Sequence, residues 1–141
     1  MTYKLAAIFS LMLCSPTSFA DVEGCSDGNT CFLRNSVYTG DIKLTCIQAP
    51  ELNQPYGIAA RDALRAEVHS TVMVVVANVG SDGKPRVELI RDDGLNLGLE
   101  LVRRGLAKVS KSCSDFAYGP AEAEAANAAL GLWGIAPHSA E

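Results

Sequence analysis

The sequence predicts an α+β fold, and three observations lead to this class. Residues 71–79 form a continuous apolar, largely β-branched run, which is typical of a strand buried on both faces. Residues 56–70 carry apolar side chains at spacings of three and four, the pattern of an amphipathic helix. Before them lie short segments of strand character, bounded by Gly, Asx and Pro turns. One chain of this length therefore combines a sheet with helices.

The other elements follow in order along the chain. A tight turn is expected at residues 27–30, where Gly28 would supply a positive φ and the Asx side chains would bond to the local backbone. Strands are expected at residues 30–33, 41–47, 71–79 and 86–91. Helices are expected at residues 56–70, 97–104 and about 120–132. Gly105 marks the end of the second helix, and Pro120 suits the first turn of the last one.

Residues 1–20 have the pattern of a secretory signal peptide. Lys4 supplies the positive start, residues 5–13 the apolar segment, and Ser18-Phe19-Ala20 a cleavage site before Asp21. The apolar run is about half of the roughly 20 residues that a membrane span needs, so no transmembrane anchor is expected. Cleavage would leave residues 21–141 as one domain with a core of about 24–135.

Four cysteines would remain after cleavage: Cys25, Cys31, Cys46 and Cys113. An even number in an exported chain, without a Cys-x-x-Cys spacing, favours two disulfides over a metal cluster or buried free thiols. Three pairings are open; Cys25 and Cys31 flank the turn at residues 27–30, so a bridge between them would leave Cys46 for Cys113. The periplasm of a Gram-negative bacterium is the expected location, with full secretion as the alternative.

The charge balance argues against a dedicated nucleic-acid binder. The formal net charge is −4, and loss of Lys4 with the signal peptide would make it about −5. Proteins that bind DNA or RNA non-specifically are usually basic, because phosphate neutralisation supplies much of their affinity. The net charge therefore does not favour nucleic acid as a partner, although it is compatible with a local basic patch.

Several motifs resemble the staphylococcal (thermo)nuclease family. That family opens with an Asp-Gly-Asp-Thr turn, continues through a strand that carries an Arg, and reaches Asp-(Thr/Ala)-Pro-Glu. The corresponding segments here are Asp27-Gly28-Asn29-Thr30, Lys43 and Gln48-Ala49-Pro50-Glu51. Further matches are Tyr56-Gly57, Asp93-Gly94, the run LVRRGLAKV at residues 101–109, and Gly131-Leu132-Trp133. The resemblance covers roughly residues 24–135 and implies an OB-fold five-stranded β-barrel with three α-helices.

The resemblance also implies a chemistry. In the family, two Asp carboxylates and a backbone carbonyl hold calcium, a Glu orients or deprotonates water, and two Arg side chains clamp the phosphate. Calcium requires anionic hard oxygen ligands, and the developing phosphate charge suits bidentate guanidinium donors.

Carried over position by position, this set is degenerate. Asn29 and Gln48 stand in place of the two metal-binding Asp residues, and the carbonyl position falls on Ala49. Lys43 replaces the first phosphate-clamping Arg, which keeps the charge but loses the planar fork. Glu51 alone is retained as a potential base. Calcium would therefore meet neutral amides, and no cofactor is expected unless the nuclease alternative holds.

The second clamping Arg is ambiguous. Counting back from Asp93-Gly94 without a gap lands on Pro85, whereas a slip of one residue would give the role to Arg86. Lys111 and Cys113 stand where the family has base-stacking tyrosines. Substitute carboxylates would have to come from nearby acidic residues, namely Asp41, Asp92 and Asp93.

Three functions remain open at this point. The favoured one is an exported pseudo-nuclease that has lost catalysis and binds an unknown protein or envelope ligand. The first alternative is an active or weak calcium-dependent phosphodiesterase that uses Glu51 and Arg86. The second is a structural subunit of an envelope or DNA-transfer assembly. The first two differ in whether the corner around Asn29, Gln48 and Glu51 can capture a cation.

Overall fold

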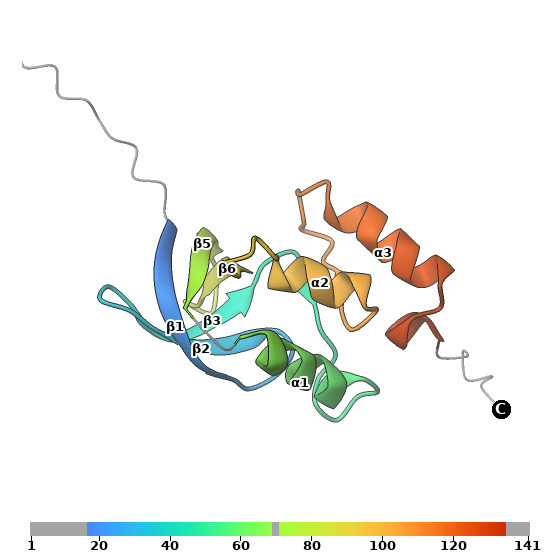
Figure 1. Ribbon diagram of the computed structural model, residues 1–141, viewed down its shortest axis with the longest axis horizontal. Coiled ribbons are helices and arrows are strands. Elements are labelled where there is room, and N and C mark those ends of the chain that lie inside the picture. The colour runs from blue at the N-terminus through green and yellow to red at the C-terminus, as the bar shows by residue number, and fades with distance from the viewer. Residues whose placement is uncertain (1–16, 69–70, 135–141) are drawn as a thin grey trace, which may run out of the picture.

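The computed structural model describes residues 17–68 and 71–134, and its centre is a closed five-stranded barrel (Figure 1). The strand order around the barrel is β1-β2-β3-β6-β5. The barrel strands are β1 Thr17–Cys25, β2 Thr30–Arg34, β3 Thr39–Leu44, β5 Val72–Val79 and β6 Pro85–Ile90. A separate two-stranded sheet pairs β4 Ile47–Gln48 with β7 Lys108–Val109. The predicted five-stranded barrel is thereby confirmed.

The strand register brings distant parts of the chain together. Four of the five barrel pairings are antiparallel, whereas β3 and β6 run parallel. In that parallel pair Lys43 is the register partner of Arg86. Two residues that are far apart in the sequence therefore lie side by side at one end of the barrel.

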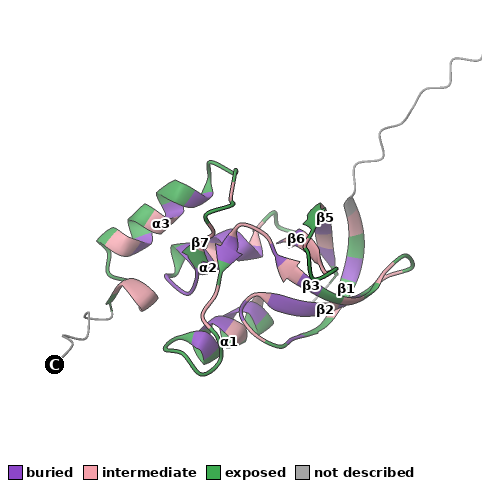
Figure 2. Ribbon diagram, turned by 180° about the vertical axis from the view of Figure 1, so that it is seen from behind, coloured by how far each residue is buried: buried purple, intermediate pink, exposed green. Residues whose placement is uncertain are grey.

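Within the described part of the chain, three α-helices accompany the barrel, as predicted. They are α1 Gly57–Glu67, α2 Leu97–Arg103 and α3 Tyr118–Asn127, followed by a short 3-10 helix, η1 Gly131–Gly134. Helix α2 contacts α1, strand β6 and α3, which places it between the barrel and α3 (Figure 1). Buried residues gather in the strands, in α2 and on one side of α1, whereas much of α3 is exposed (Figure 2). Within the described residues, no helix is long and apolar enough to cross a membrane.

Two disulfides fasten this architecture. Cys25–Cys31 joins the end of β1 to β2 across the turn, and Cys46–Cys113 ties the β3–β4 connection to the loop before α3. Of the three pairings that the sequence left open, the structure has the one in which Cys25 bridges to Cys31 and Cys46 to Cys113. Because disulfides persist in oxidising compartments, the two bridges indicate that the chain functions in one.

Several local predictions were wrong. The strand expected at residues 41–47 is split: β3 ends at Leu44, and Cys46 adopts a left-handed conformation with φ 65° before β4 begins. β5 is not buried on both faces, since Val72 and Val74 are buried but residues 77–79 are exposed. The last helix is α3 at Tyr118–Asn127, so it begins and ends earlier than expected. Side chains on a strand alternate between its two faces, and the buried residues of β5, Val72 and Val74, accordingly lie two positions apart on one face.

Strand β1 was not predicted, because residues 17–20 were assigned to the signal peptide. Thr17 to Ala20 pair with Val75 to Val72 of β5, and Ala20 is buried at 3% exposure. The expected cleavage after Ala20 stays a prediction, and the rest of the signal peptide lies outside the described residues. If cleavage occurs there, it removes the β1 side of the β1–β5 pairing.

Candidate active-site corner

The turn at residues 27–30 is closed by its own carboxylate. Asp27 Oδ1 accepts hydrogen bonds from the backbone N–H groups of Asn29 at 2.8 Å and Thr30 at 2.7 Å. Gly28 is required for close packing rather than for a positive φ. A Cβ at Gly28 would lie 2.7 Å from the Cβ of Ala60 and 2.9 Å from that of Ala49. The turn is therefore pressed between α1 and the segment after β4.

Asn29 is anchored at the mouth of the barrel. Its carbonyl oxygen accepts a hydrogen bond of 2.8 Å from the backbone N–H of Leu44, at the end of β3. Its side-chain oxygen Oδ1 is buried and has no hydrogen-bond partner among the described residues. A buried oxygen without a partner is costly, and it is the kind of atom that a ligand or a water molecule satisfies.

Gln48 and Ala49 belong to the same corner and lie at the end of β4, in the small two-stranded sheet and just after it. Gln48 is exposed and pairs in register with Lys108 of β7, while Ala49 is half-buried. A shallow hollow of about 300 Å³ opens beside them. It is lined by Gln48, Ala49, Pro50, Gln54, Lys108 and Leu132.

Glu51 lies on an exposed turn whose backbone is fixed. Its N–H donates to Oε1 of Gln54 at 2.9 Å, and its carbonyl accepts from the N–H of Gln54 at 2.9 Å. Gly57 packs directly against this carbonyl, because a Cβ at residue 57 would overlap the Glu51 oxygen. Within the described residues, the Glu51 carboxylate makes no hydrogen bond or ion pair, so it remains available as a base or a ligand.

The two cations expected at the phosphate position share one carboxylate. Asp82, in the β5–β6 hairpin, lies 3.1 Å from Arg86 through both of its oxygens and 3.6 Å from Lys43 Nζ. The hydrogen bonds from Arg86 lower the pKa of Asp82 to about 2, with help from the Lys84 N–H and the charge of Lys43. Asp82 is therefore ionised at neutral pH, and its negative charge is paired with both Arg86 and Lys43.

Two of the three proposed substitute carboxylates are also engaged, whereas Asp92 is exposed and has no hydrogen bond or ion pair with a described residue. Asp41 lies 3.7 Å from Lys84 Nζ, and Asp93 pairs with Arg91 at 2.5 Å. The Arg91 hydrogen bond lowers the pKa of Asp93 to about 2. Within residues 17–68 and 71–134, no group of three or more His, Cys, Asp or Glu side chains could hold a metal ion.

The residues at the corner do not fit calcium. Asn29 Oδ1 offers one buried oxygen without a partner, but that oxygen is neutral, and Gln48 adds a second neutral amide. Asp27 Oδ1 already accepts two backbone hydrogen bonds. Hard divalent cations prefer several anionic oxygens, and among the family's ligand positions at this corner only Glu51 carries a carboxylate.

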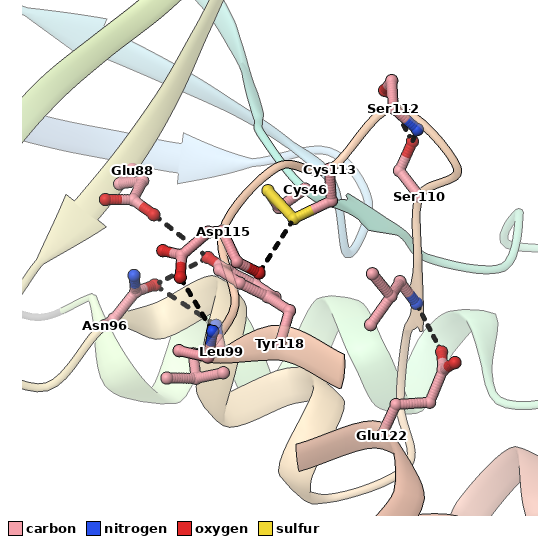
Figure 3. Close-up of a disulfide and its surroundings, with 12 residues drawn as sticks. Cys46, Glu88, Asn96, Leu99, Ser110, Ser112, Cys113, Asp115, Tyr118 and Glu122 are labelled. Atoms are coloured by element: carbon pink, nitrogen blue, oxygen red, sulfur yellow. Dashed lines mark hydrogen bonds between the residues drawn. A yellow bond between two sulfur atoms is a disulfide. The ribbon is translucent and has the colours of Figure 1, made fainter. Parts of the chain in front are cut away.

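Sequence reasoning missed a polar cluster under the second disulfide (Figure 3). Tyr118, at 1% exposure, places its hydroxyl 3.4 Å from both Glu88 Oε1 and Asn96 Oδ1. Burial raises the pKa of Tyr118, and the negative charge of Glu88 raises it further. Asn96 also caps α2 by accepting from the N–H of Leu99 at 3.2 Å. These contacts fix α3 against α2 and β6, so the cluster is structural.

At the two positions where the family has base-stacking tyrosines, the chain has no aromatic side chain, although Phe116, three residues beyond Cys113, is 94% exposed. Cys113 forms the half-buried bridge to Cys46, and Lys111 is exposed. Tyr118 lies five residues beyond Cys113 but is buried beneath the loop (Figure 3). A nucleotide base would therefore find no stacking partner at the two expected positions.

The barrel, the helices and this corner define an OB-type nuclease scaffold. The family model of the staphylococcal nuclease homologues matches residues 41–134, well over half of the chain. The chain therefore belongs to the staphylococcal nuclease family. No curated protein matches it.

The structure brings together part of the expected site. Asn29 meets the end of β3, Ala49 lies against the same turn, and Lys43 and Arg86 are neighbours in register. Because Arg86 is the register partner of Lys43, the pairing favours Arg86 over Pro85 for the role of the second phosphate-clamping cation. The role of Asp82 was not predicted; the signal for it was an acidic residue four positions before Arg86 in a Gly-rich turn.

Proposed function

We propose that this member of the staphylococcal nuclease family has lost phosphodiester hydrolysis and acts as an exported binding module. The observation that carries the proposal is the pair of amides, Asn29 and Gln48, at the positions of the metal-binding acids. Asn29 Oδ1 carries no charge and has no hydrogen-bond donor among the residues that the structure describes. The corner therefore lacks two of the negative charges that hold the divalent cation in the family.

The magnitude of the loss supports this proposal. Removal of one well-placed contact to a transition state typically lowers the rate by about 10²–10³. Both metal acids are replaced here, and Lys43 lacks the bidentate fork of a guanidinium. Even with non-additive effects, Glu51 and Arg86 alone would retain little of the chemistry.

An apolar surface beside Glu51 supports a protein or envelope ligand. Leu52, Tyr56 and Ile58 are exposed at 40%, 41% and 54%. They line an open hollow of about 520 Å³, together with Gln54, Pro55, Ala59 and Asp62. Adjacent exposed apolar side chains mark interaction sites more often than isolated ones do. The oxidising location indicated by the two disulfides is consistent with a ligand of the cell envelope, in the periplasm or outside the cell.

The proposal is tested by plasmid degradation in the presence of calcium. Purified wild-type protein and the variant Glu51→Gln are incubated with plasmid DNA under the same conditions. We expect no metal-dependent cleavage by either protein. Cleavage by the wild type that disappears in Glu51→Gln would overturn the proposal and establish the weak phosphodiesterase alternative.

The apolar surface is tested separately by charge insertion. We expect Ile58→Glu to abolish co-purification of an envelope partner. Val37→Glu is the matched control, because Val37 is 89% exposed and lies in the β2–β3 connection, away from this hollow. Equal partner recovery by both variants would show that the hollow is not the binding surface.

A further inference from the structure

We propose that Asp82 is a specificity-determining residue that excludes phosphate-bearing ligands from the Lys43–Arg86 pair. This inference rests on the proposed function and deepens it, because it states which ligand class this end of the barrel refuses. The contacts of Asp82 lie outside the amide corner, so they can be altered without touching Asn29 or Gln48.

Asp82 occupies the place of an anion between two cations. Lys43 and Arg86 are partners across the parallel β3–β6 pair, so their side chains project from adjacent strands. Asp82 Oδ1 lies 3.1 Å from Arg86 Nη1, and Oδ2 lies 3.1 Å from Nη2 and 3.6 Å from Lys43 Nζ. This is the bidentate arrangement by which a guanidinium binds carboxylates and phosphates alike.

The hairpin holds the carboxylate in this position. Asp82 Oδ1 also accepts a 3.0 Å hydrogen bond from the backbone N–H of Lys84. The turn itself is closed by the N–H of Gly80 bonding to the carbonyl of Lys84 at 3.0 Å. Asp82 is thus a fixed part of a short hairpin, and it meets the cations at little entropic cost.

Arg86 is folded back over the same hairpin. Its Nη1 donates to the carbonyl of Lys84 at 3.0 Å. The guanidinium lies against Gly80, where a Cβ would come within 2.5 Å of Nη2 and 2.6 Å of Cζ. The absence of a side chain at residue 80 therefore makes room for the folded-back guanidinium. An incoming phosphate would have to pull Arg86 out of this position and displace Asp82.

The cluster is accessible enough for such a competition to be measured. The side chains of Lys43 and Asp82 are each 34% exposed, and that of Arg86 is 26% exposed. Three cations, Lys43, Lys84 and Arg86, face two carboxylates here, those of Asp82 and Asp41. Neutralising Asp82 would leave three positive charges opposed by Asp41 alone.

The test is a titration of inorganic phosphate, followed by NMR or calorimetry in buffer that contains EDTA. We expect Asp82→Asn to bind phosphate about five- to tenfold more tightly than wild type, because two exposed ion pairs no longer compete. Asp62→Asn is the matched control: it removes one carboxylate and one ion pair, the 3.0 Å contact with Arg61 on α1. Asp82→Asn with Arg86→Gln should lose the gain.

Gly80→Ala provides a second route to the same end. Its Cβ would push the Arg86 guanidinium away from Asp82 while leaving every charge in place, so we expect phosphate to bind more tightly here too. Circular dichroism checks that each variant is folded. The proposal is overturned if folded Asp82→Asn and Gly80→Ala bind phosphate no better than Asp62→Asn, or if wild type already binds it equally well.

Failure of this inference is distinguishable from failure of the proposed function. The phosphate titration contains no metal ion, so it reports on the Asp82 cluster alone. Calcium-dependent cleavage of plasmid by the wild type would contradict the loss of catalysis. It would not affect the phosphate test, whose outcome depends only on how Asp82→Asn, Gly80→Ala and Asp62→Asn bind phosphate.

Discussion

The Cys46–Cys113 disulfide should supply a large share of the stability of this small domain. Its two cysteines are 67 residues apart in the sequence, whereas Cys25 and Cys31 are separated by 6. In the chain-entropy description, a disulfide lowers the conformational entropy of the unfolded chain and so raises its free energy, by about 4 kcal/mol for the longer loop and about 2 kcal/mol for the shorter one. We therefore expect Cys46→Ser with Cys113→Ser to lower the free energy of unfolding by about 4 kcal/mol.

The assay is urea unfolding of the oxidised wild type and the double variant, followed by circular dichroism. Ser is a suitable replacement because both cysteines are only half-buried. Cys25→Ala with Cys31→Ala is the comparison, and its loss would include the packing of two buried sulfur atoms. A loss below about 1 kcal/mol for the Cys46 and Cys113 variant, at an unchanged m-value, would refute the reasoning.

Three further outcomes are expected. Gly57→Ala should destabilise the fold by about 2 kcal/mol or more, because its Cβ overlaps the Glu51 carbonyl, whereas Gly119→Ala, with open space around it, should be neutral or slightly stabilising in thermal unfolding. A chain that begins at Asp21 should lose about 2 kcal/mol or more relative to one that begins at Thr17, since residues 17–20 pair with β5; equal melting temperatures would contradict this. Because the folded pKa of Asp82 is depressed to about 2, its contribution is present above about pH 4 and lost as pH falls toward 2. Asp82→Asn should flatten the fall of melting temperature across that window, and an unchanged pH profile would contradict the pairing.

Much of the fold could be predicted because local patterns agree with it. The apolar spacing of residues 56–70 matches α1, in which Ala60, Ala63 and Leu64 are buried. The Gly- and Asp-rich turns at residues 80–84 and 92–94 lie between elements as expected. Where prediction failed, a tertiary constraint was responsible. The strand expected at residues 41–47 is interrupted where Cys46, bridged to Cys113, adopts a positive φ, and the apolar run of β5 extends into an exposed hairpin arm.

The candidate site was predictable in its positions but not in its pairings. The turn, the Pro-Glu segment and Lys43 could be placed from motifs alone. The sequence could not show that a parallel β3–β6 register sets Lys43 beside Arg86, nor that Asp82 would pair with both. Such contacts depend on strand register, which a hydrophobic pattern specifies only weakly at the polar end of a strand. The burial of Tyr118 likewise follows from the packing of α3 on α2.

The central claim, that two amides cannot capture the cation that two acids hold, is tested most directly by a calcium titration. Calorimetry compares the wild type with a variant that restores both acids, Asn29→Asp with Gln48→Asp. The account predicts no saturable binding by the wild type and binding with a Kd of about 10⁻⁴–10⁻³ M or tighter in the restored variant. Saturable binding of calcium by the wild type in that same range would contradict it.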